Sequence, residues 1–298
     1  MTSQSYRLLA PRKRARKRQG TWQLRLARWA GLALIYALLT LGALTMVFPF
    51  YWMVSTAFKS IQEALIFPPT LVPTEWLWSN FREAWEAAPF PRYFANTTFM
   101  ASASTLGTLI TTVLAAYAFA RMRFFGKNVL FILFMATMMM PFEVILIPNF
   151  LIIKTLKWYN TFLALIVPWT ASVFGIFLLR QFYLSLPKDL FDAAVIDGCS
   201  HFRFLWNVAV PLSVPALITV GIFSFLGSWN SLLWPLIVTS NPEMRPIQVG
   251  LTAFQSEAGS YYNRMMAAAT LAVLPIVAMF LVAQKQFVEG IARTGLKG

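Results

Sequence analysis

Long apolar stretches separated by short charged segments dominate this chain. Five intervals contain no Asp, Glu, Lys or Arg and a sixth contains only Glu143; they are residues 29–58, 93–120, 158–179, 204–242, 265–284 and, with Glu143, 128–153. A helix needs about 20 apolar residues to cross the roughly 30 Å of bilayer hydrocarbon. A charged side chain at the centre of a spanning helix costs about 2.5–3.5 kcal/mol. The pattern therefore predicts an all-α integral membrane protein with six transmembrane helices.

The six helices are expected at residues 29–54, 93–120, 128–153, 161–183, 214–238 and 265–283. Pro141 and Pro148 fall inside the third helix and are expected to kink it, because proline removes an intrahelical hydrogen bond. Neighbouring helices can accommodate such kinks in a bundle. The proline-rich segment 56–92 is the longest connection between helices, and it is expected to hold one short amphipathic helix over residues 79–88.

Composition and charge agree with a membrane protein and give its orientation. The 298 residues are 58% hydrophobic and 12% charged, against about 45–50% and 25% in soluble domains. The net charge of +14 and the basic run 12–18 could indicate nucleic-acid binding. The positive-inside rule explains them better, because 18 of the 25 basic residues fall on the side that holds both termini. We expect a basic cytoplasmic arm (1–28), a six-helix membrane domain (29–285) and a cytoplasmic tail (286–298).

The connection 185–213, between the fourth and fifth helices, is predicted to form a helix–turn–helix elbow on the cytoplasmic side. Pro187 suits a first helical turn, and Gly198 can end the helix in a left-handed conformation. The spacing places one set of side chains on one face of this first helix: Leu190, Ala193, Ala194 and Asp197. Asp192 adds a negative charge that a basic partner could pair with.

Ser200 is expected to cap the second helix of the elbow, and Pro211 is expected to end it. One face of this helix is predicted to carry Phe202, Leu205, Trp206 and Ala209. The same pattern would also fit a solvated loop that lies at the membrane surface.

A sequence signature in the elbow resembles the EAA loop of the membrane subunits of bacterial ABC importers. Seven residues fall in register with that signature: Asp192, Ala193, Ala194, Gly198, Val208, Val210 and Pro211. Asp replaces the usual Glu, and Val replaces the usual Ile and Leu. The resemblance implies a type I ABC importer permease fold with a cytoplasmic coupling loop. It also implies that the elbow inserts into a separate ATPase subunit, with the coupling residues Asp192, Ala193, Ala194, Asp197, Gly198 and Pro211.

Further segments resemble the carbohydrate-uptake branch of these permeases, in particular the smaller, second chain of the maltose-permease type. They are residues 94–97, 117–121, 125–127, 228–230, 234–236 and the tail 290–298. The resemblance implies that Gly295, Lys297 and Gly298 contact the ATPase. The implied partners are a homologous second permease chain, two ABC ATPase subunits and an extracytoplasmic solute-binding protein in a bacterial inner membrane. ATP and Mg²⁺ would bind to the ATPase subunits, and a carbohydrate would cross by alternating access.

The sequence lacks a nucleotide-binding motif and a complete set of metal ligands. It contains no G-x-x-x-x-G-K-[ST] phosphate-binding loop. Cys199 and His201 are the only closely spaced Cys–His pair of possible metal ligands, and a structural zinc site usually has four ligands. We therefore expect no enzymatic activity, no cofactor and no metal in this chain, and no nucleic-acid partner.

Three residues inside the expected helices are candidates for the translocation path. Glu143 is an intramembrane carboxyl group, which often marks a functional site; alternatively, it lies near the outer mouth, hydrogen-bonded where Pro141 frees a carbonyl. Trp229 and Asn230 could stack on a sugar and bond its hydroxyls, or they could simply join helices. In the maltose type, the bound sugar is held mainly by the other permease chain.

Other functions fit parts of the sequence. An importer of glycerol 3-phosphate or a related polyol phosphate is the nearest variant. An ion-coupled secondary transporter would be expected to show inverted repeats and buried ionisable groups, and Glu143 is the one acidic residue in the expected helices. In a membrane scaffold without transport activity, the basic arm would be the functional part.

Overall fold

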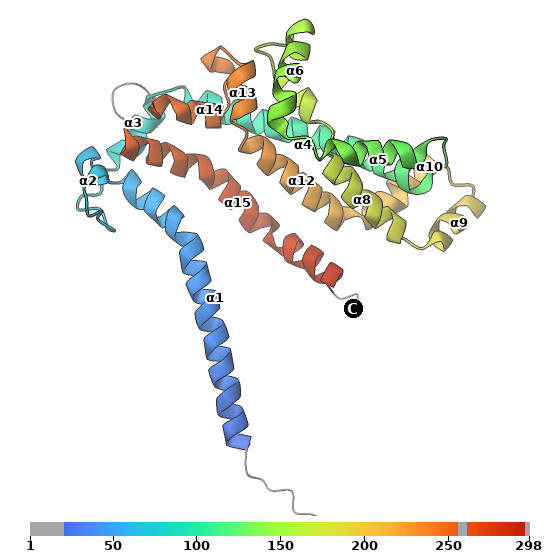
Figure 1. Ribbon diagram of the computed structural model, residues 1–298, viewed down its shortest axis with the longest axis horizontal. Helices are drawn as coiled ribbons and strands as arrows, with labels where there is room; N and C mark the ends of the chain where they lie inside the picture. Colours follow the sequence, from blue (N-terminus) through green and yellow to red (C-terminus); the bar gives the residue numbers. More distant parts are fainter. Residues whose placement is uncertain (1–20, 256–260, 296–298) are drawn as a thin grey trace, which may run out of the picture. The chain divides into compact units, whose positions relative to one another are not determined.

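The computed structural model describes residues 21–255 and 261–295 of the chain (Figure 1). The first 20 residues of the basic arm, and Lys297 and Gly298 of the tail, lie outside the described residues. The chain divides into two units, residues 1–52 and 53–298. The first unit contributes most of α1 (Thr21–Ala57), and the second contains all of the other helices.

The described residues form helices and loops, without a β-strand. The α-helices of the second unit are α2 (Ile61–Leu65), α3 (Ser79–Glu86), α4 (Phe90–Arg121), α5 (Lys127–Thr137), α6 (Phe142–Thr155), α7 (Phe162–Ile166), α8 (Val173–Ser185), α9 (Lys188–Ile196), α10 (His201–Phe204), α11 (Val210–Leu212), α12 (Val214–Trp229), α13 (Leu233–Val238), α14 (Ile247–Leu251) and α15 (Tyr262–Gly295). A π-helix covers Leu205–Ala209, and 3₁₀ turns cover Val167–Trp169, Pro242–Met244 and Thr252–Gln255. The predicted all-α fold is confirmed.

Four helical segments of the described chain are long and apolar enough to cross a membrane: Leu26–Ala57, Phe90–Arg121, Phe162–Ser185 and Tyr262–Val282. Two bent pairs bring the number to six if each pair counts as one span. These pairs are α5 with α6, bent by 103°, and residues 201–212 with α12, bent by 80°. Each of the six predicted spans overlaps one of these segments, although the second bent pair begins in the elbow and ends at Trp229, before the predicted end of the fifth span.

The third, fourth and fifth spans are less regular than predicted. The fourth, predicted over residues 161–183, consists of α7, the 3₁₀ turn Val167–Trp169 and α8, with non-helical residues 170–172 before α8. Pro141 does more than kink the third span: it takes an extended conformation, with ψ of 139°, between α5 and α6. The prediction of one continuous helix over 214–238 was wrong, because α12 ends at Trp229 and α13 begins at Leu233. Pro235 explains this break, since a proline lacks the N–H for a helical bond to the residue four positions earlier and clashes with its carbonyl.

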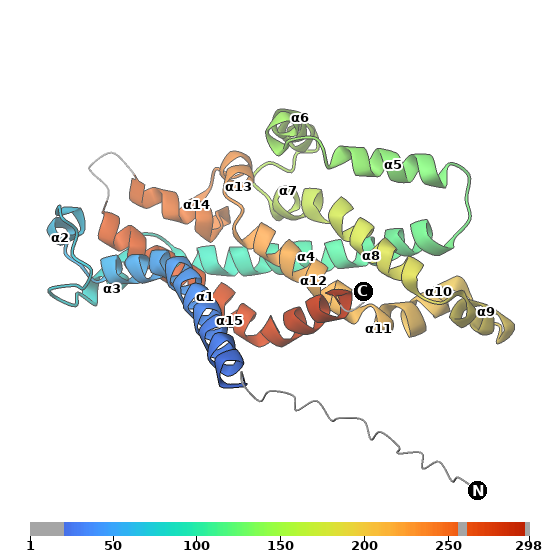
Figure 2. The ribbon, with the colours of Figure 1, turned by 60° about the horizontal axis from the view of Figure 1, so that its bottom comes forward.

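In the second unit, α4 packs side by side with α8 and α12 (Figures 1 and 2). Two glycines permit a close approach of these segments. A Cβ at Gly107 of α4 would lie 2.6 Å from Thr170, and one at Gly175 of α8 would lie 2.9 Å from Val220 of α12. Small residues at such crossings are typical of helix packing in membranes.

A buried amide network joins α3 and α15 to the segment that follows α1. The Asn80 side chain donates to the carbonyls of Ala57 and Lys59, at 2.9 and 2.8 Å. The Asn263 side chain donates to the Lys59 carbonyl at 3.1 Å. Segment 56–92 is thus attached to α15 by hydrogen bonds. It contains α3, which was predicted, and α2, which was not. Ser60 caps α2 by accepting from the Glu63 N–H.

Glu63 organises the loop that follows α2. Its carboxylate accepts from the Thr70 hydroxyl at 2.8 Å and from the backbone N–H and hydroxyl of Thr74 at 3.0 and 2.9 Å. Burial raises the pKa of Glu63, but these hydrogen bonds and the charge of Lys59 outweigh it, so the pKa lies below its usual value. A lowered carboxyl pKa stabilises the folded loop above the unfolded value of about 4.3, and this contribution is lost as the pH falls through the folded pKa.

We therefore expect the amide of Thr74 to exchange faster with solvent below about pH 4 than at neutral pH, after correction for the intrinsic rate. Hydrogen-exchange mass spectrometry of the full chain in nanodiscs measures this. The Glu63→Gln variant is the control and should lose the pH dependence. Equal protection of the wild-type loop at both pH values would contradict the assignment.

Candidate functional site

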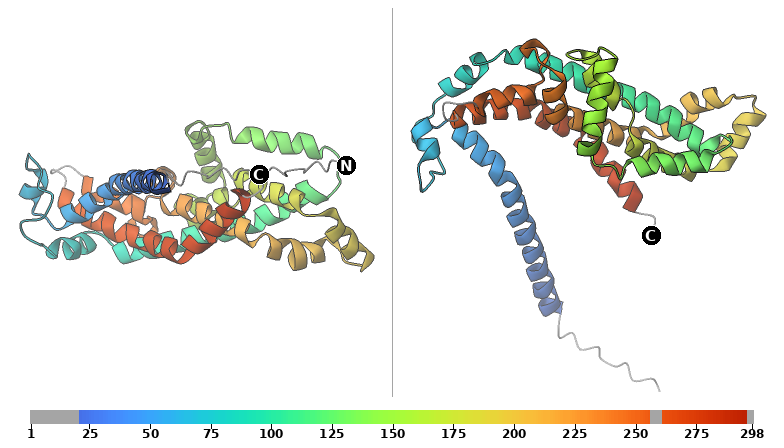
Figure 3. Two further views of the ribbon diagram at one scale, coloured as in Figure 1. Left: turned by 90° about the horizontal axis from the view of Figure 1, so that it is seen from below. Right: turned by 45° about the horizontal axis from the view of Figure 1, so that its top comes forward.

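The elbow predicted at residues 185–213 forms a compact hairpin of short helices. It comprises α9, a turn at Gly198, α10, the π-helix and α11. Within the second unit it lies at one end, beside the last turns of α4 and α8, whereas α3 and α14 lie at the other end (Figures 2 and 3). Arg121, at the end of α4, donates to the Leu186 carbonyl at 2.7 Å. The elbow and the α4–α5 turn therefore share one side of the molecule.

The turn of the elbow is a Schellman motif centred on Gly198. Gly198 has a φ of +72°, a left-handed conformation that favours glycine. The Gly198 N–H donates to the Val195 carbonyl at 3.0 Å, and the Cys199 N–H donates to the Ala194 carbonyl at 2.8 Å. These two bonds satisfy carbonyls at the end of α9 that would otherwise lack partners. Ser200 then caps α10 by accepting from the Arg203 N–H at 3.3 Å, as the sequence predicted.

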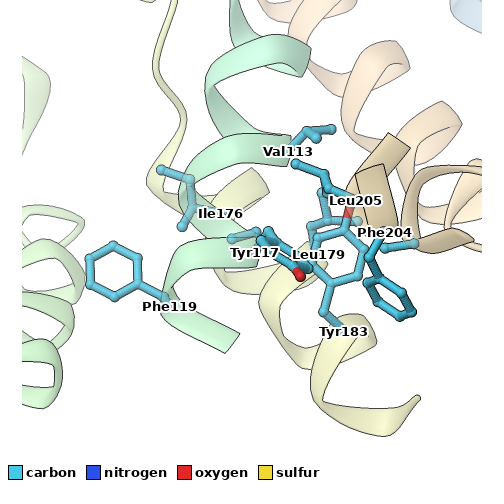
Figure 4. Packing of buried hydrophobic residues seen from close by; sticks show 10 residues of the cluster. Val113, Tyr117, Phe119, Ile176, Leu179, Tyr183, Phe204 and Leu205 are labelled. Atoms are coloured by element: carbon cyan, nitrogen blue, oxygen red, sulfur yellow. The ribbon is translucent and has the colours of Figure 1, made fainter. Parts of the chain in front are cut away.

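A hydrophobic core fastens the elbow to the transmembrane helices. Phe204 and Leu205 are buried with Tyr117 of α4 and with Leu179 and Tyr183 of α8 (Figure 4). His201 Nδ1 lies 3.0 Å from the Tyr117 hydroxyl, and the ring of Phe191 lies 5.1 Å from that of His201 and 5.2 Å from that of Phe204. The elbow is therefore packed directly against α4 and α8.

The second helix of the elbow does not present the face that the sequence predicted. Leu205 and Ala209 are buried, but Trp206 is exposed and Phe202 is 66% exposed. The buried face is formed by Phe204, Leu205 and Ala209, so Phe202 and Trp206 lie on the other side of the helix, where their rings are 6.1 Å apart. A π-helix follows α10, and in it the Val210 N–H donates to the Leu205 carbonyl five residues earlier. The helix also continues through Pro211 to Leu212 instead of ending at the proline.

The coupling residues predicted from the signature differ in their surroundings. Asp192, Ala193, Asp197, Gly198 and Pro211 are exposed, whereas Ala194 is half-buried and packs against the core below the elbow. The predicted common face of α9 is thus divided, because Ala194 points inward. Pro211 belongs to the last turn of the second helix and lies apart from the Gly198 turn along the chain.

The exposed surface of the elbow carries unpaired charge and apolar side chains. No ion pair joins Asp192 or Asp197 to another residue of the described chain. Ile196 is 85% exposed, and Leu190 and Phe202 are also exposed. Apolar side chains that are exposed beside unpaired carboxylates form a surface that a protein partner can cover.

The residues predicted for the translocation path differ in their surroundings. Glu143 is exposed in the first turn of α6, just after the Pro141 break, and makes no side-chain hydrogen bond within the described chain. Trp229 is 2% exposed; its indole donates to the Ala272 carbonyl of α15 at 3.3 Å, the helix-joining contact given above as the alternative. Asn230 is exposed in the break after α12, and its side-chain oxygen accepts from the Gln248 amide at 3.4 Å.

Gly295, the described residue of the predicted tail contact, is the last residue of α15. The sequence analysis missed the Tyr117–His201 contact and the role of Phe204 as the buried anchor. The local pattern contains no signal for them, because the partner residues lie 84 positions apart in the chain.

Comparisons with known proteins agree with the structure. Residues 98–293 match the family described as "binding-protein-dependent transport system inner membrane component". The sn-glycerol-3-phosphate transport system permease protein UgpE of Yersinia enterocolitica is 35% identical over 266 residues, which cover 86% of this chain and 94% of the relative. A probable ABC transporter permease protein of Bacillus subtilis, YurM, is 33% identical over 272 residues, which cover 91% and 90% of the two chains.

A solved bacterial ABC transporter, involved in the import of the acidic polysaccharide alginate, shares the fold. The TM-score is 0.76 at 24% identity, over 88% of this chain and 97% of that chain. The match to the family model includes the whole elbow, four of the six expected spans in full and most of the second. The chain therefore belongs to the family of binding-protein-dependent transport system inner membrane components.

Proposed function

We propose that this chain is one of two permease subunits of an ATP-driven importer, and that its elbow is the contact through which the ATPase moves it. The observation that carries the proposal is the geometry of the elbow. It has an exposed acidic and apolar surface on one side and a buried anchor to α4 and α8 on the other. A force applied to the exposed side would be transmitted through the anchor to these two spanning helices.

The proposed complex contains a homologous second permease chain, two ATPase subunits that bind ATP and Mg²⁺, and an extracytoplasmic binding protein. Family membership makes this chain a transport component of an inner membrane and not an enzyme. The charge distribution of the sequence supports cytoplasmic termini and a cytoplasmic elbow. ATP-driven closure of the ATPase pair then displaces the elbow, and the helix bundle alternates between outward and inward access.

We propose a carbohydrate or a related polyol as the solute. The segments that resemble the carbohydrate-uptake branch support this proposal. The name of the Yersinia relative favours glycerol 3-phosphate as the second candidate. An ion-coupled transporter receives little support, because such carriers place buried ionisable groups near the middle of the membrane and Glu143 is exposed.

Reversing the charge of Asp192 tests the proposed contact. We expect Asp192→Lys to reduce co-purification of the ATPase subunits with a tagged permease by about tenfold or more, because a charge-assisted contact becomes a repulsive one. The yield of the permease should not change, because Asp192 is exposed and has no ion-pair partner in the described chain.

The matched control is Glu75→Lys, which makes the same charge change at an exposed residue of the loop before α3. This variant should retain the ATPase subunits at the wild-type level. Full retention by Asp192→Lys, or an equal loss in both variants, would show that the elbow is not the ATPase contact.

A further inference from the structure

A cavity of about 440 Å³ lies within the second unit, between α4, the α7–α8 segment and the α12–α13 segment. Its volume falls in the range of about 300–1,000 Å³ that is usual for small-molecule sites. Six hydroxyl side chains line it: Ser104, Thr108, Ser172, Ser224, Ser228 and Ser231. The three residues that the sequence analysis assigned to the translocation path, Glu143, Trp229 and Asn230, do not line it.

The cavity lies where two spanning segments are interrupted. The helical path is broken at residues 170–172, before α8, and at residues 230–232, between α12 and α13. Ser172 lines the cavity at the first break and Ser231 at the second. Irregular backbone inside a membrane protein is tolerated where it lines a cavity, and transporters commonly bind solutes at such discontinuous helices.

The hydroxyl groups of the cavity are only partly used within the protein. The Thr108 hydroxyl donates to the Trp169 carbonyl at 2.8 Å, and the Ser172 hydroxyl accepts from the Gly175 N–H at 3.1 Å. Ser104 is 1% exposed, yet its hydroxyl has no hydrogen-bond partner in the described chain. Buried polar groups are almost always paired, so the Ser104 hydroxyl points to a ligand group or to water in the cavity.

The remaining lining is aromatic and uncharged. Trp169 and Trp234 contribute rings whose centroids lie 6.3 Å apart in an edge-to-face arrangement. Trp234 is buried, and its indole N–H donates to the Ala164 carbonyl at 2.9 Å, so the exposed ring of Trp169 is the aromatic surface available to a solute. None of the residues that line the cavity is Lys, Arg, His, Asp or Glu. A phosphate or carboxylate would therefore find no opposite charge here.

We propose that this cavity is a subsite for a neutral, hydroxyl-bearing part of the transported solute, such as a sugar ring or a polyol. The inference rests on the proposed transport function and specifies which part of a solute this chain holds. The serine hydroxyls would bond the solute hydroxyls, and the exposed ring of Trp169 would cover a C–H face of the solute. An anionic group of the same solute would have to be bound outside this cavity.

Thiol labelling of the full transporter tests the proposal without requiring transport. In a Cys199→Ser background, Ser228→Cys places one thiol in the cavity of this chain, and Ser240→Cys places a control thiol at an exposed residue outside it. The reagent is a small water-soluble methanethiosulfonate. The probes are glucose, maltose, raffinose and glycerol as neutral solutes, and glycerol 3-phosphate and glucuronate as anions, all at equal saturating concentration.

We expect at least one neutral probe to slow the labelling of Ser228→Cys about fivefold or more and to leave Ser240→Cys unaffected. Adding Ser104→Ala to the background should weaken that protection by up to about tenfold in apparent affinity, since one hydrogen bond to the solute is lost. This substitution removes no hydrogen bond within the described chain, so expression should not change.

Lack of protection by every neutral probe would overturn the inference, and so would equal protection by an anion. ATP-driven uptake by the wild-type complex distinguishes a failure of the subsite from a failure of the proposed transport function. If it shows no ATP-driven uptake of the solute of its binding protein, the transport assignment itself is wrong. If it does transport that solute while the thiol stays unprotected, only the subsite is wrong.

Discussion

Valine in place of Gly198 should reduce solute-stimulated ATP hydrolysis by the assembled transporter to near its unstimulated rate. The left-handed conformation at Gly198 costs other L-residues about 1–2 kcal/mol, and a β-branched residue is especially poor there. Space is not the obstacle, because a Cβ at Gly198 would meet no atom within 4 Å. To relieve the strain, the turn must give up the bonds from Gly198 and Cys199 that end α9, so the two helices of the elbow lose their fixed angle.

Asparagine at the same position provides an internal comparison. Asn adopts left-handed conformations more readily than other non-glycine residues, so Gly198→Asn should retain most of the coupling. Gly126→Val is the matched control, since Gly126 has a φ of +76° and also has no atom within 4 Å of an added Cβ. It imposes the same strain on a turn outside the elbow and should leave coupling largely intact. Wild-type coupling in Gly198→Val would contradict the proposed role of the turn.

Truncation of Phe204 should destabilise the protein far more than truncation of Phe202. Phe204 is 2% exposed and packs with Tyr117 and Phe191, and a buried Phe→Ala change costs about 3–5 kcal/mol. Phe202 lies two residues earlier but is largely exposed, so Phe202→Ala should leave stability nearly unchanged. Its expected effect is weaker co-purification of the ATPase subunits, because an exposed apolar contact to the partner is lost.

Thermal unfolding in detergent measures the first effect, and co-purification measures the second. Phe204→Ala should lower the unfolding temperature by several degrees, and Phe202→Ala should not. The two variants thus separate the anchored side of the elbow from its contact side. Equal unfolding temperatures for both variants would mean that Phe204 does not hold the elbow in place.

Features that depend on a few neighbouring residues were predictable from the sequence. Stretches without charged residues indicated the approximate position of each span. Gly198 indicated the turn of the elbow, and Ser200 indicated the cap of its second helix. These predictions succeeded because one residue and its local backbone determine the outcome. The signature from Asp192 to Pro211 suggested the role that is proposed for the elbow, which periodicity alone would not have provided.

Features that depend on tertiary packing were not predictable. The inward face of the second elbow helix was centred on the wrong residue, because Phe204 and not Phe202 packs in the core with Tyr117. The break at residues 230–232 has a local cause in Pro235, whose effect the sequence analysis did not consider. The cavity could not be foreseen, because its hydroxyls come from three parts of the chain that meet only in the folded bundle.

The elbow and the cavity are joined by α4, which is a single continuous helix. Tyr117, at the elbow, and Thr108, at the cavity, lie on the same uninterrupted helix, with nine residues of rise or about 14 Å between them. Pro91, in its first turn, is the only proline in α4, so no flexible joint separates the two positions. A twist imposed at the proposed ATPase contact would therefore reach the proposed solute cavity in the same stroke, and affinity for cargo is expected to change with each cycle of ATP.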